Sequence, residues 1–235
     1  MSHMSRLLNI SAPAHIEQAA EIIAQGGVIA AAFNGVFGLF GDADCPAAAT
    51  KILEIKNRPE EKNLILVTAP EFLHEHLDLT ANAFQYHPLE KLQRLYRETH
   101  ALGMILPAAV PGAPHHLVRN GTVVNIWTEY PPYQAIRQLI TALRRRGKRA
   151  LAGTSANKSG LPTFTSTRQV LDAFGDGIPV VLGDSFEHLP PIRRISTTIV
   201  DFTKPHPRLF RVGNVPENEL REHLKRLGLR DLVVC

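Results

Sequence analysis

Residues 56–62 read Lys56-Asn57-Arg58-Pro59-Glu60-Glu61-Lys62, and they lead directly into an apolar stretch at residues 63–68. Three cations so close together at the mouth of a buried strand can converge on one polyphosphate, and Pro59 stiffens the turn because its ring fixes φ. Arginine offers a phosphate a planar fork, whereas lysine offers a point charge. The alternative is a solvated surface turn in which these cations pair with Glu54, Glu60 and Glu61.

Around this loop, strand-like and helix-like segments alternate along most of the chain. Residues 16–25 carry an apolar stripe with helical spacing that ends at Gly26-Gly27, and residues 28–33 form an apolar run of strand length. Some predicted strands follow one another without a helix, as residues 103–106 and 122–127 do. We therefore predict one α/β domain over residues 1–235, built on a mixed sheet with flanking helices.

The same patterns predict the remaining elements. Helices are expected at residues 46–55, 88–98, 133–146 and 217–226, with a further helical stretch opening at Ala69-Pro70. Strands are expected at residues 64–67, 103–107, 122–127, 150–154, 180–182, 198–202 and 209–212. Residues 34–44 contain Gly35, Gly38 and Gly41, so we predict a turn there that closely approaches another group. Residues 214–235 are expected to form a C-terminal helix and tail.

The composition limits the class of protein. The chain has 235 residues, of which 44% are hydrophobic and 20% charged, as in ordinary globular proteins. No apolar run approaches the roughly 18–20 residues that a membrane helix needs. The formal net charge of +4 favours anionic ligands without requiring nucleic acid. Cys45 and Cys235 make neither a disulfide framework nor a zinc site, which predicts a reducing, cytoplasmic setting. Met1-Ser2-His3-Met4 resembles a cloning remnant ahead of a start near Met4.

A second candidate site is Gly153-Thr154-Ser155-Ala156-Asn157-Lys158-Ser159-Gly160. A predicted strand runs directly into small hydroxyl and amide residues, which let backbone N–H groups approach a ligand and supply neutral hydrogen bonds. An ordinary loop is the alternative, since Ser, Asn and Gly are common in turns.

A third candidate lies in the last predicted strands, Ser196-Thr197-Thr198-Ile199-Val200-Asp201 and Arg208-Leu209-Phe210-Arg211-Val212-Gly213. Arg211 stands on an apolar strand, where an unpaired charge is costly. It therefore either pairs with a carboxylate such as Asp201 or points into a ligand cleft, and the sequence leaves both readings open.

Other charged groups are less informative. The run Arg144-Arg145-Arg146-Gly147-Lys148-Arg149 ends a predicted helix, where cations suit the helix dipole, and RNA contact is a second reading. The sequence shows no Ser/His/Asp or Cys/His catalytic set. The histidines lack the spacing of a metal site and are expected at the surface: His74, His76, His87, His100, His115, His116 and His188.

Three motifs in a fixed order resemble the YrdC family, whose best-known members are threonylcarbamoyl-AMP synthases. Residues 52–66 look like that family's Lys-x-Arg-Pro loop and following strand, and residues 154–160 look like its Ser-x-Asn signature. Residues 197–201 and 211–213 resemble its terminal Ser-Thr-x-x-Asp and Arg-x-Gly pair. The similarity extends over residues 16–224.

The resemblance implies a twisted, open α/β sheet with a large basic cleft. It also implies a reaction in which ATP, bicarbonate and L-threonine yield threonylcarbamoyl-AMP and pyrophosphate, the first step toward the t6A modification of tRNA. Mg²⁺ would be bound through the triphosphate. Lys56, Arg58 and Lys62 would hold the phosphates and act in catalysis. Ser155, Asn157 and Arg211 would be further nucleotide contacts.

The chain departs from the family pattern on the amino-acid side. The family's Pro-Thr-Glu-Thr-Val-Tyr-Gly-Leu reads here with Phe33 and Asn34 in place of Thr-Glu. Its Val-Arg-x-Pro strand, whose Arg faces the amino-acid carboxylate, carries Asn125, and Thr197 replaces the terminal Ser. Losing that Arg removes a contact worth about 1.5–3 kcal/mol. The resemblance therefore implies a retained phosphate side and an altered substrate pocket.

Two further hypotheses keep this fold. One is a non-catalytic paralogue that binds nucleotide, tRNA or double-stranded RNA through the same basic cleft, as a translation or ribosome-assembly factor. The other retains only a phosphate-binding pocket for a nucleotide metabolite.

Overall fold

The computed structural model describes residues 6–33, 35–57, 64–99, 102–128, 134–158, 161–175, 177–183 and 194–234. Its strands are β1 (Arg6–Asn9), β2 (Ile29–Phe33), β3 (Val36–Asp42), β4 (Ile65–Thr68), β5 (Gly103–Pro107), β6 (Thr122–Trp127), β7 (Leu151–Ser155), β8 (Val180–Gly183), β9 (Ile199–Asp201), β10 (Arg208–Arg211) and β11 (Val233–Val234). Its helices are α1 (Pro13–Ala24), α2 (Pro46–Ile55), α3 (Ala83–Tyr86), α4 (Leu89–Thr99), α5 (Gln134–Arg144), α6 (Thr167–Phe174) and α7 (Glu217–Arg226), with 3-10 turns η1 (Pro70–Glu75) and η2 (His115–Leu117).

The described strands form one sheet in the order β1-β8-β2-β3-β7-β4-β6-β5-β9-β10-β11. The sheet is mixed, because it contains both parallel and antiparallel pairs: β4, for example, runs parallel to β6 but antiparallel to β7. The predicted mixed α/β architecture is therefore confirmed.

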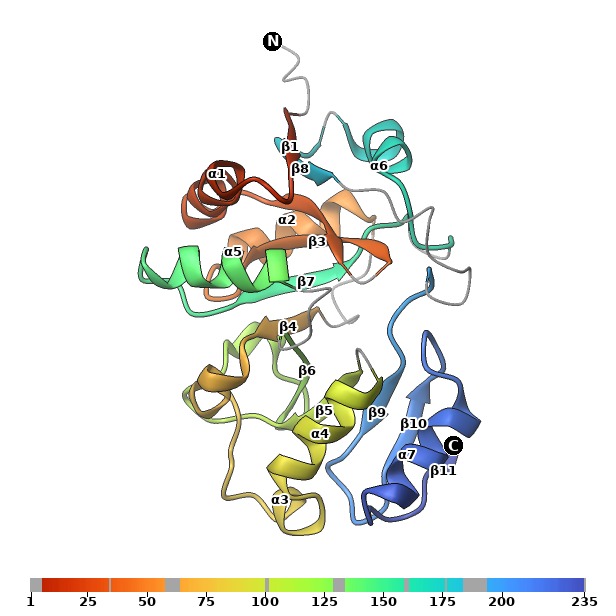
Figure 1. The fold of residues 1–235 in the computed structure, drawn as a ribbon. Coiled ribbons are helices and arrows are strands. Elements are labelled where there is room, and N and C mark those ends of the chain that lie inside the picture. The colour runs from red at the N-terminus through yellow and green to blue at the C-terminus, as the bar shows by residue number, and fades with distance from the viewer. Residues whose placement is uncertain are drawn as a thin grey trace.

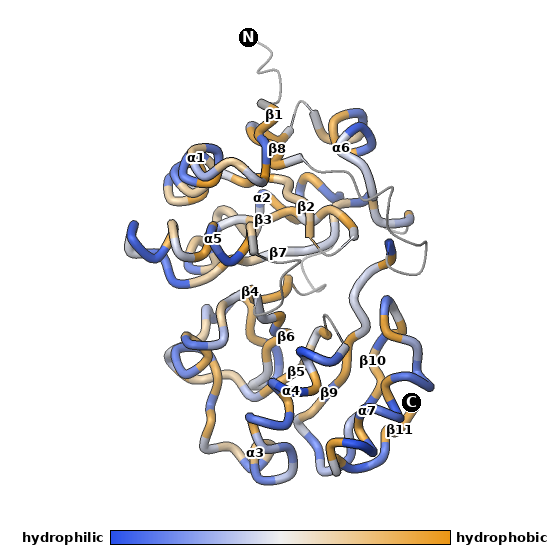
Figure 2. The backbone as a smooth tube through the Cα atoms, viewed as in Figure 1, coloured by the Kyte–Doolittle hydropathy of each residue, from blue (hydrophilic) through white to orange (hydrophobic). Residues whose placement is uncertain are grey.

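The sheet twists through two halves of the molecule (Figure 1). One half carries β1, β8, β2, β3 and β7 with α1, α2, α5 and α6, and the other carries β4 to β6 and β9 to β11 with α3, α4 and α7. The pairing of β7 with β4 joins them. Apolar residues follow the central strands and polar residues the outer turns of the helices (Figure 2), so one continuous hydrophobic core spans both halves.

Residues 34–44 differ from the prediction. They were expected to form a glycine-rich turn, and this is wrong, because Val36–Asp42 form a strand that is fully buried between β2 and β7. The expected close approach does occur: a Cβ atom on Gly41 would lie 3.0 Å from the Cβ of Ala48 in α2. Glycine here lets the first turn of α2 pack closely on β3.

Several short elements carry no strong signal in the sequence. The predictions above omit β1, β11, α3 and α6. For α6 a local signal exists, since the Ser166 hydroxyl accepts from the Gln169 backbone N–H while the Gln169 side chain accepts from the Ser166 N–H. None of the helices in the described ranges combines the length and the apolar character needed to cross a bilayer.

Candidate functional site

Lys56 lies at the end of α2, where the chain turns sharply because Asn57 adopts a positive φ of 48°. The side chain is buried, with 3% of its surface exposed. Its Nζ donates to the Ser155 carbonyl and, over 2.8 Å, to Asn157 Oδ1. Both acceptors are neutral oxygens, and these two bonds orient the ammonium toward the end of β7.

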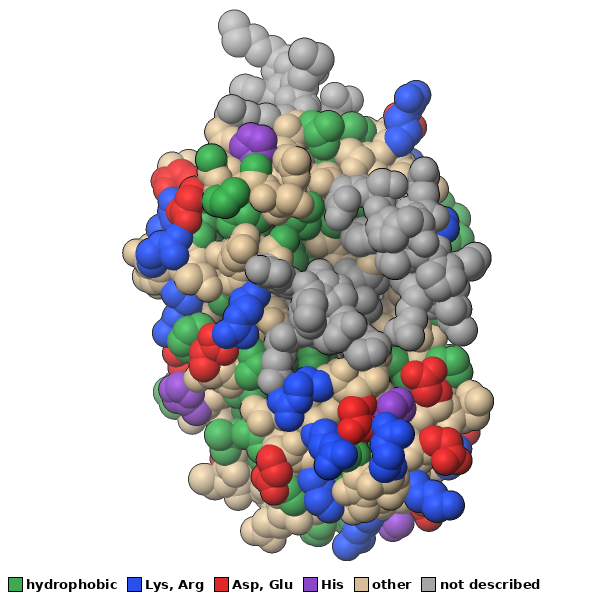
Figure 3. Space-filling view, in the orientation of Figure 1, with side chains coloured by type: hydrophobic (Ala, Val, Ile, Leu, Met, Phe, Trp, Pro, Cys, Tyr) green, Lys and Arg blue, Asp and Glu red, His purple; other side chains and the backbone are tan. Residues whose placement is uncertain are grey.

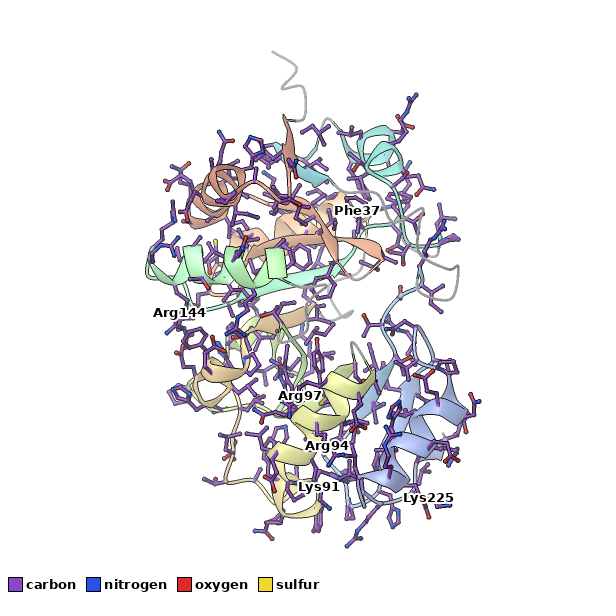
Figure 4. The ribbon with its side chains drawn as sticks, viewed as in Figure 1. Phe37, Lys91, Arg94, Arg97, Arg144 and Lys225 are labelled. Carbon is purple, nitrogen blue, oxygen red and sulfur yellow. The ribbon has the colours of Figure 1, made fainter. Side chains whose placement is uncertain are left out.

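Ser155 and Asn157 form the other side of this contact, where β7 ends. The Ser155 hydroxyl donates to Asn157 Oδ1 over 2.7 Å, and Asn157 Nδ2 donates to the Leu161 carbonyl over 2.7 Å. The loop is anchored on β3 through Phe37, labelled in Figure 4, whose carbonyl accepts from the Ala156 N–H over 2.6 Å. Lys56, Ser155 and Asn157, predicted from separate motifs, therefore meet in one hydrogen-bonded group.

Arg211 belongs to a second group at the end of β10. Its Nε and Nη2 donate to the Thr197 carbonyl over 3.2 and 2.7 Å. Thr197 itself is buried. Gly213 packs so tightly on this segment that a Cβ there would lie 2.0 Å from the Ser196 carbonyl oxygen. The sequence left two readings open for Arg211, a carboxylate partner or a ligand cleft. The structure shows a further partner, a backbone carbonyl.

Thr198 and Asn214 were not singled out as site residues, yet they hold this second group in place. The Thr198 hydroxyl accepts from the Gly213 and Val215 N–H groups over 2.8 and 3.0 Å. The Asn214 side-chain oxygen accepts from the Thr198 N–H over 2.9 Å. The sequence does offer a signal, because Thr198 lies within the terminal motif at residues 197–201 and Asn214 directly follows the motif at residues 211–213.

One contact joins the two groups across the halves of the molecule. Thr163 Oγ1 and Ser196 Oγ lie 2.7 Å apart in a hydrogen bond. In Figure 1 the segment that leads into β9 rises beside the segment between β7 and α6. We call this line of contacts, from Lys56 through Asn157 and Thr163 to Ser196 and Arg211, the seam. No motif pointed to Thr163.

Two of the residues predicted to alter the substrate pocket, Phe33 and Asn125, lie in apolar surroundings. The ring of Phe33 lies 5.5 Å from that of Phe40, tilted by 59°. Asn125 is fully buried in β6, opposite Leu66 and Met104, and both of its amide atoms lack a hydrogen-bond partner within the described residues. Three predicted site residues, Asn34, Arg58 and Lys62, lie outside the described residues.

The cations of the basic run at residues 144–149 form ion pairs with carboxylates elsewhere in the chain. Arg144, labelled in Figure 4, makes a bidentate contact with Glu75 at 2.6 and 2.7 Å and lowers the pKa of that carboxyl. The remaining pairs are Arg145–Glu17, Arg146–Glu17, Arg146–Glu21, Lys148–Asp42 and Arg149–Asp44. The run therefore ties helices and strands together, and this disfavours RNA contact through these cations.

The surface placement expected for the histidines is wrong at two positions. His76 and His87 are fully buried. Burial lowers the pKa of His76 to about 4, and the pKa of His87 is lowered for the same reason. Tertiary packing decides this, because neither residue lies on a recognisable apolar stripe. Among the described residues, no cluster of His, Cys, Asp or Glu is arranged to hold a metal ion.

Cations also gather over α4 and α7, with carboxylates between them (Figure 3). Lys91, Arg94 and Arg97 follow one another along α4 in Figure 4. Arg94 pairs with Glu98 at 2.9 Å but keeps 62% of its side chain exposed. Lys91 donates to the Gly228 carbonyl over 3.1 Å.

Comparison with known proteins shows which family the chain resembles. The Sua5/YciO/YrdC family model, described as telomere recombination, matches residues 21–213. A threonylcarbamoyl-AMP synthase of Enterobacter sp. (strain 638) is 33% identical over 180 residues, which cover 75% of this chain and 87% of that protein. The protein of the same name from Escherichia coli (strain K12) is 31% identical over the same shares.

Solved structures show the same fold. P. abyssi Sua5 in complex with L-threonine superposes with a TM-score of 0.76 at 23% identity, covering 98% of this chain and 62% of that one. A double variant of P. abyssi Sua5 gives the same TM-score at 25% identity, with 66% of that chain covered. E. coli YciO gives 0.68 at 19% identity, with 91% and 96% covered. The family model and the relatives above show that the chain belongs to the Sua5/YciO/YrdC family.

Proposed function

We propose that this chain is an ATP-dependent, adenylate-forming enzyme of the threonylcarbamoyl-AMP synthase type with an altered amino-acid pocket. The observation that carries the proposal is the buried Lys56 ammonium held by Ser155 and Asn157 at the end of α2. A cation that neutral oxygens hold in place is suited to contact a phosphate. The relatives named threonylcarbamoyl-AMP synthase supply the reaction class.

In this reaction the protein has to position the reactants, more than to take part in covalent chemistry itself. Bicarbonate gives CO₂ by losing hydroxide, and the amine nitrogen of the acceptor bonds to the CO₂ carbon and loses a proton to form a carbamate, so that the hydroxide and the proton leave as water. A carbamate oxygen attacks the α-phosphorus of ATP, and the bond from that phosphorus to the bridging oxygen breaks, so that pyrophosphate leaves with the electron pair. Lys56, Arg58 and Lys62 would neutralise the triphosphate, while Ser155, Asn157 and Arg211 would orient the nucleotide. Mg²⁺ would be held by the triphosphate.

The substitutions predicted in the amino-acid pocket affect which acceptor amine can bind. Phe33 places an aromatic ring where the family has a threonine, and Asn125 places a neutral amide where it has an arginine. An amide cannot form the charge-assisted bond that an arginine offers to a carboxylate. L-threonine is therefore expected to bind weakly, and a different amine would be the preferred acceptor.

The first experiment separates the two sides of the site. Calorimetry with ATP–Mg²⁺, followed by L-threonine, is expected to show nucleotide binding and weak or absent threonine binding. Pyrophosphate release in the presence of bicarbonate and each of the twenty amino acids then tests catalysis. Release with none of them would exclude an amino-acid acceptor.

Lys56→Gln tests the phosphate side directly. The substitution removes the charge from the end of α2, and ATP affinity is expected to fall by about tenfold or more, the loss of one charge-assisted contact. Lys51→Gln, on the same helix with an exposed side chain, is the matched control. Equal ATP affinities for the two variants would contradict a phosphate contact at Lys56.

The row of cations on α4 favours a second candidate function, binding of tRNA or double-stranded RNA. Arg94→Gln/Arg97→Gln would then weaken an RNA gel shift and reduce its salt dependence, because two phosphate contacts are lost. Arg145→Gln is the control, since that cation has a similarly exposed side chain but follows α5 and lies outside the row on α4. Binding that is absent, or unaffected by salt, would exclude this function.

A further inference from the structure

The described part of the sheet ends at β11, which contains only Val233 and Val234. β11 runs parallel to β10, where Val233 lies opposite Arg208 and Val234 lies opposite Leu209. No other described strand pairs with β11, so the outer side of β11 is a free sheet edge. Both valine side chains are exposed, to 43% and 51%. β11 is therefore an apolar edge strand, and Figure 1 places it at the outside of one half of the molecule.

A row of basic residues lies next to this strand. The loop that leads into β10 reads Lys204-Pro205-His206-Pro207-Arg208, with a proline between successive basic residues. The three basic residues are exposed, whereas Pro207 is buried. Because a proline ring fixes φ, the two prolines leave this loop little conformational entropy to lose when a ligand binds. Within the described ranges, neither Lys204 nor Arg208 forms an ion pair.

The basic loop and the edge strand form one surface. A hollow of about 440 Å³ is lined by residues of both, which are Lys204, Pro205, His206, Arg208, Val233 and Val234. A hydrogen bond of 2.8 Å from the Val233 N–H to the Pro207 carbonyl joins the two segments. We call the hollow with its six lining residues the β11 edge. It lies at the start of β10, whereas Arg211 and the seam lie at the other end of that strand.

Basic side chains beside a free strand edge fit an extended polypeptide that carries carboxylates next to apolar side chains. The backbone of such a segment can pair with the outer side of β11, and its apolar side chains can cover the two valines. Its carboxylates can contact Lys204 and Arg208, which have no competing ion pair within the described ranges.

Two other occupants fit this surface less well. A second copy of the chain would bring two basic loops together if the two β11 strands paired, and like charges across such a contact are destabilising. Single-stranded nucleic acid would satisfy the cations, but its bases stack on aromatic rings, and no phenylalanine, tyrosine or tryptophan lines the hollow.

We propose that the β11 edge is a docking surface for an acidic, extended segment of a partner protein, which adds a strand to the sheet beside β11. The inference is independent of the proposed nucleotide site, since none of the six lining residues belongs to the seam. Because β11 offers only two residues for strand pairing, the interaction is expected to be weak, with a Kd on the order of 100 μM.

The probe is a fluorescein-labelled peptide with an acidic half of glutamates and an apolar half that alternates valine and threonine. Fluorescence anisotropy measures its binding to the full chain. Two comparison peptides replace either the glutamates by glutamines or the valines by serines. The probe is expected to bind about fivefold more tightly than either of them, because each comparison peptide lacks one half of the contact.

Lys204→Gln/Arg208→Gln tests the basic part of the surface. Removing the two cations is expected to lower the affinity for the probe about fivefold. Lys51→Gln/Arg168→Gln is the matched control, because both residues are exposed cations, on α2 and α6, and the change in net charge is the same.

Val234→Thr tests the apolar part, since it keeps the branched shape and adds a hydroxyl. The affinity for the probe is expected to fall about threefold. Val110→Thr is the control, because Val110 is 83% exposed on the loop between β5 and η2. All of these substitutions are at exposed positions, and melting temperatures check that each variant retains the fold.

Failure of the probe to bind, or equal affinities of the two double variants, would refute the proposal. Tighter binding of a single-stranded oligouridylate, weakened by Lys204→Gln/Arg208→Gln, would assign the edge to nucleic acid and also refute it. A concentration-dependent dimer in sedimentation that Val234→Thr abolishes would assign the edge to a second copy, with the same consequence. ATP binding, measured separately, tests the proposed function and is expected to be unchanged in all of these variants.

Discussion

His76 is a buried residue whose charge state affects the stability of the fold. Neither of its ring nitrogens has a hydrogen-bond partner among the described residues, and burial lowers its pKa from 6.5 to about 4. The folded protein therefore carries a neutral ring across the range in which the unfolded chain takes up a proton. Arg149 acts in the same direction through its positive charge.

Stability is expected to fall as the pH drops from about 6.5 to about 4, by up to about 3 kcal/mol, because only the unfolded state gains the proton there. Above pH 6.5 the ring is neutral in both states and contributes no pH dependence. His76→Gln cannot titrate and should flatten this decline in urea unfolding at pH 7, 5.5 and 4.5. His74→Gln, at an exposed position, should behave as the wild type. An identical slope in the His76 variant would contradict this account.

At the scale of elements, Glu98 connects α4 to α7. Its carboxylate accepts from Arg94 within α4, and from Arg226 and His223 in α7. The hydrogen bond from Arg226 is the main reason that the pKa of Glu98 is lowered to about 2. The group therefore stabilises the helix pair whenever it is ionised in the folded protein.

Glu98→Gln is expected to cost about 1 kcal/mol at pH 7, since the pairs are partly exposed and screened. In the wild type this contribution is fully present above about pH 4.5 and is lost as the pH falls toward 2, because the folded-state pKa is the lower one. Chemical unfolding at pH 7 and at pH 3 measures both the cost of Glu98→Gln and the loss of the Glu98 contribution at low pH. Glu222→Gln, exposed on α7, is the control; an equal loss there would mean that charge on α7, rather than the Glu98 contacts, matters.

The elements were predicted with unequal success. Residues 46–55, 103–107, 122–127 and 217–226 agree with α2, β5, β6 and α7 to the residue, because apolar periodicity and proline at a first turn are local signals. Residues 34–44 were assigned to a turn, because glycine suits both turns and close packing. Only the presence of α2 against β3 decides between the two.

At the scale of the whole molecule, the seam relates two halves that each contain part of the site. Thr163→Val removes its hydroxyl contact at almost constant shape and is expected to cost about 1 kcal/mol, or roughly 2–4 °C in melting temperature. If the seam also positions Arg211 relative to Lys56, ATP affinity should fall as well. Differential scanning fluorimetry with and without ATP–Mg²⁺ measures both effects.

Thr141→Val, whose hydroxyl bonds a carbonyl of its own helix, controls for the loss of any threonine hydroxyl. Equal effects of ATP on the two variants would limit Thr163 to a structural role.

The sequence by itself determined the fold class and the three motifs. Alternating apolar segments, turn residues and the order of the Lys-x-Arg-Pro, Ser-x-Asn and Arg-x-Gly stretches all depend on neighbours within a few positions. Only the tertiary structure decided how these stretches meet. The Lys56–Asn157 bond joins residues 101 positions apart, and Thr163 reaches Ser196 across the two halves. The burial of His76 and of Asn125 was decided in the same way. The physical reason is that strand order and helix packing bring together residues distant in sequence, and local periodicity does not encode such contacts.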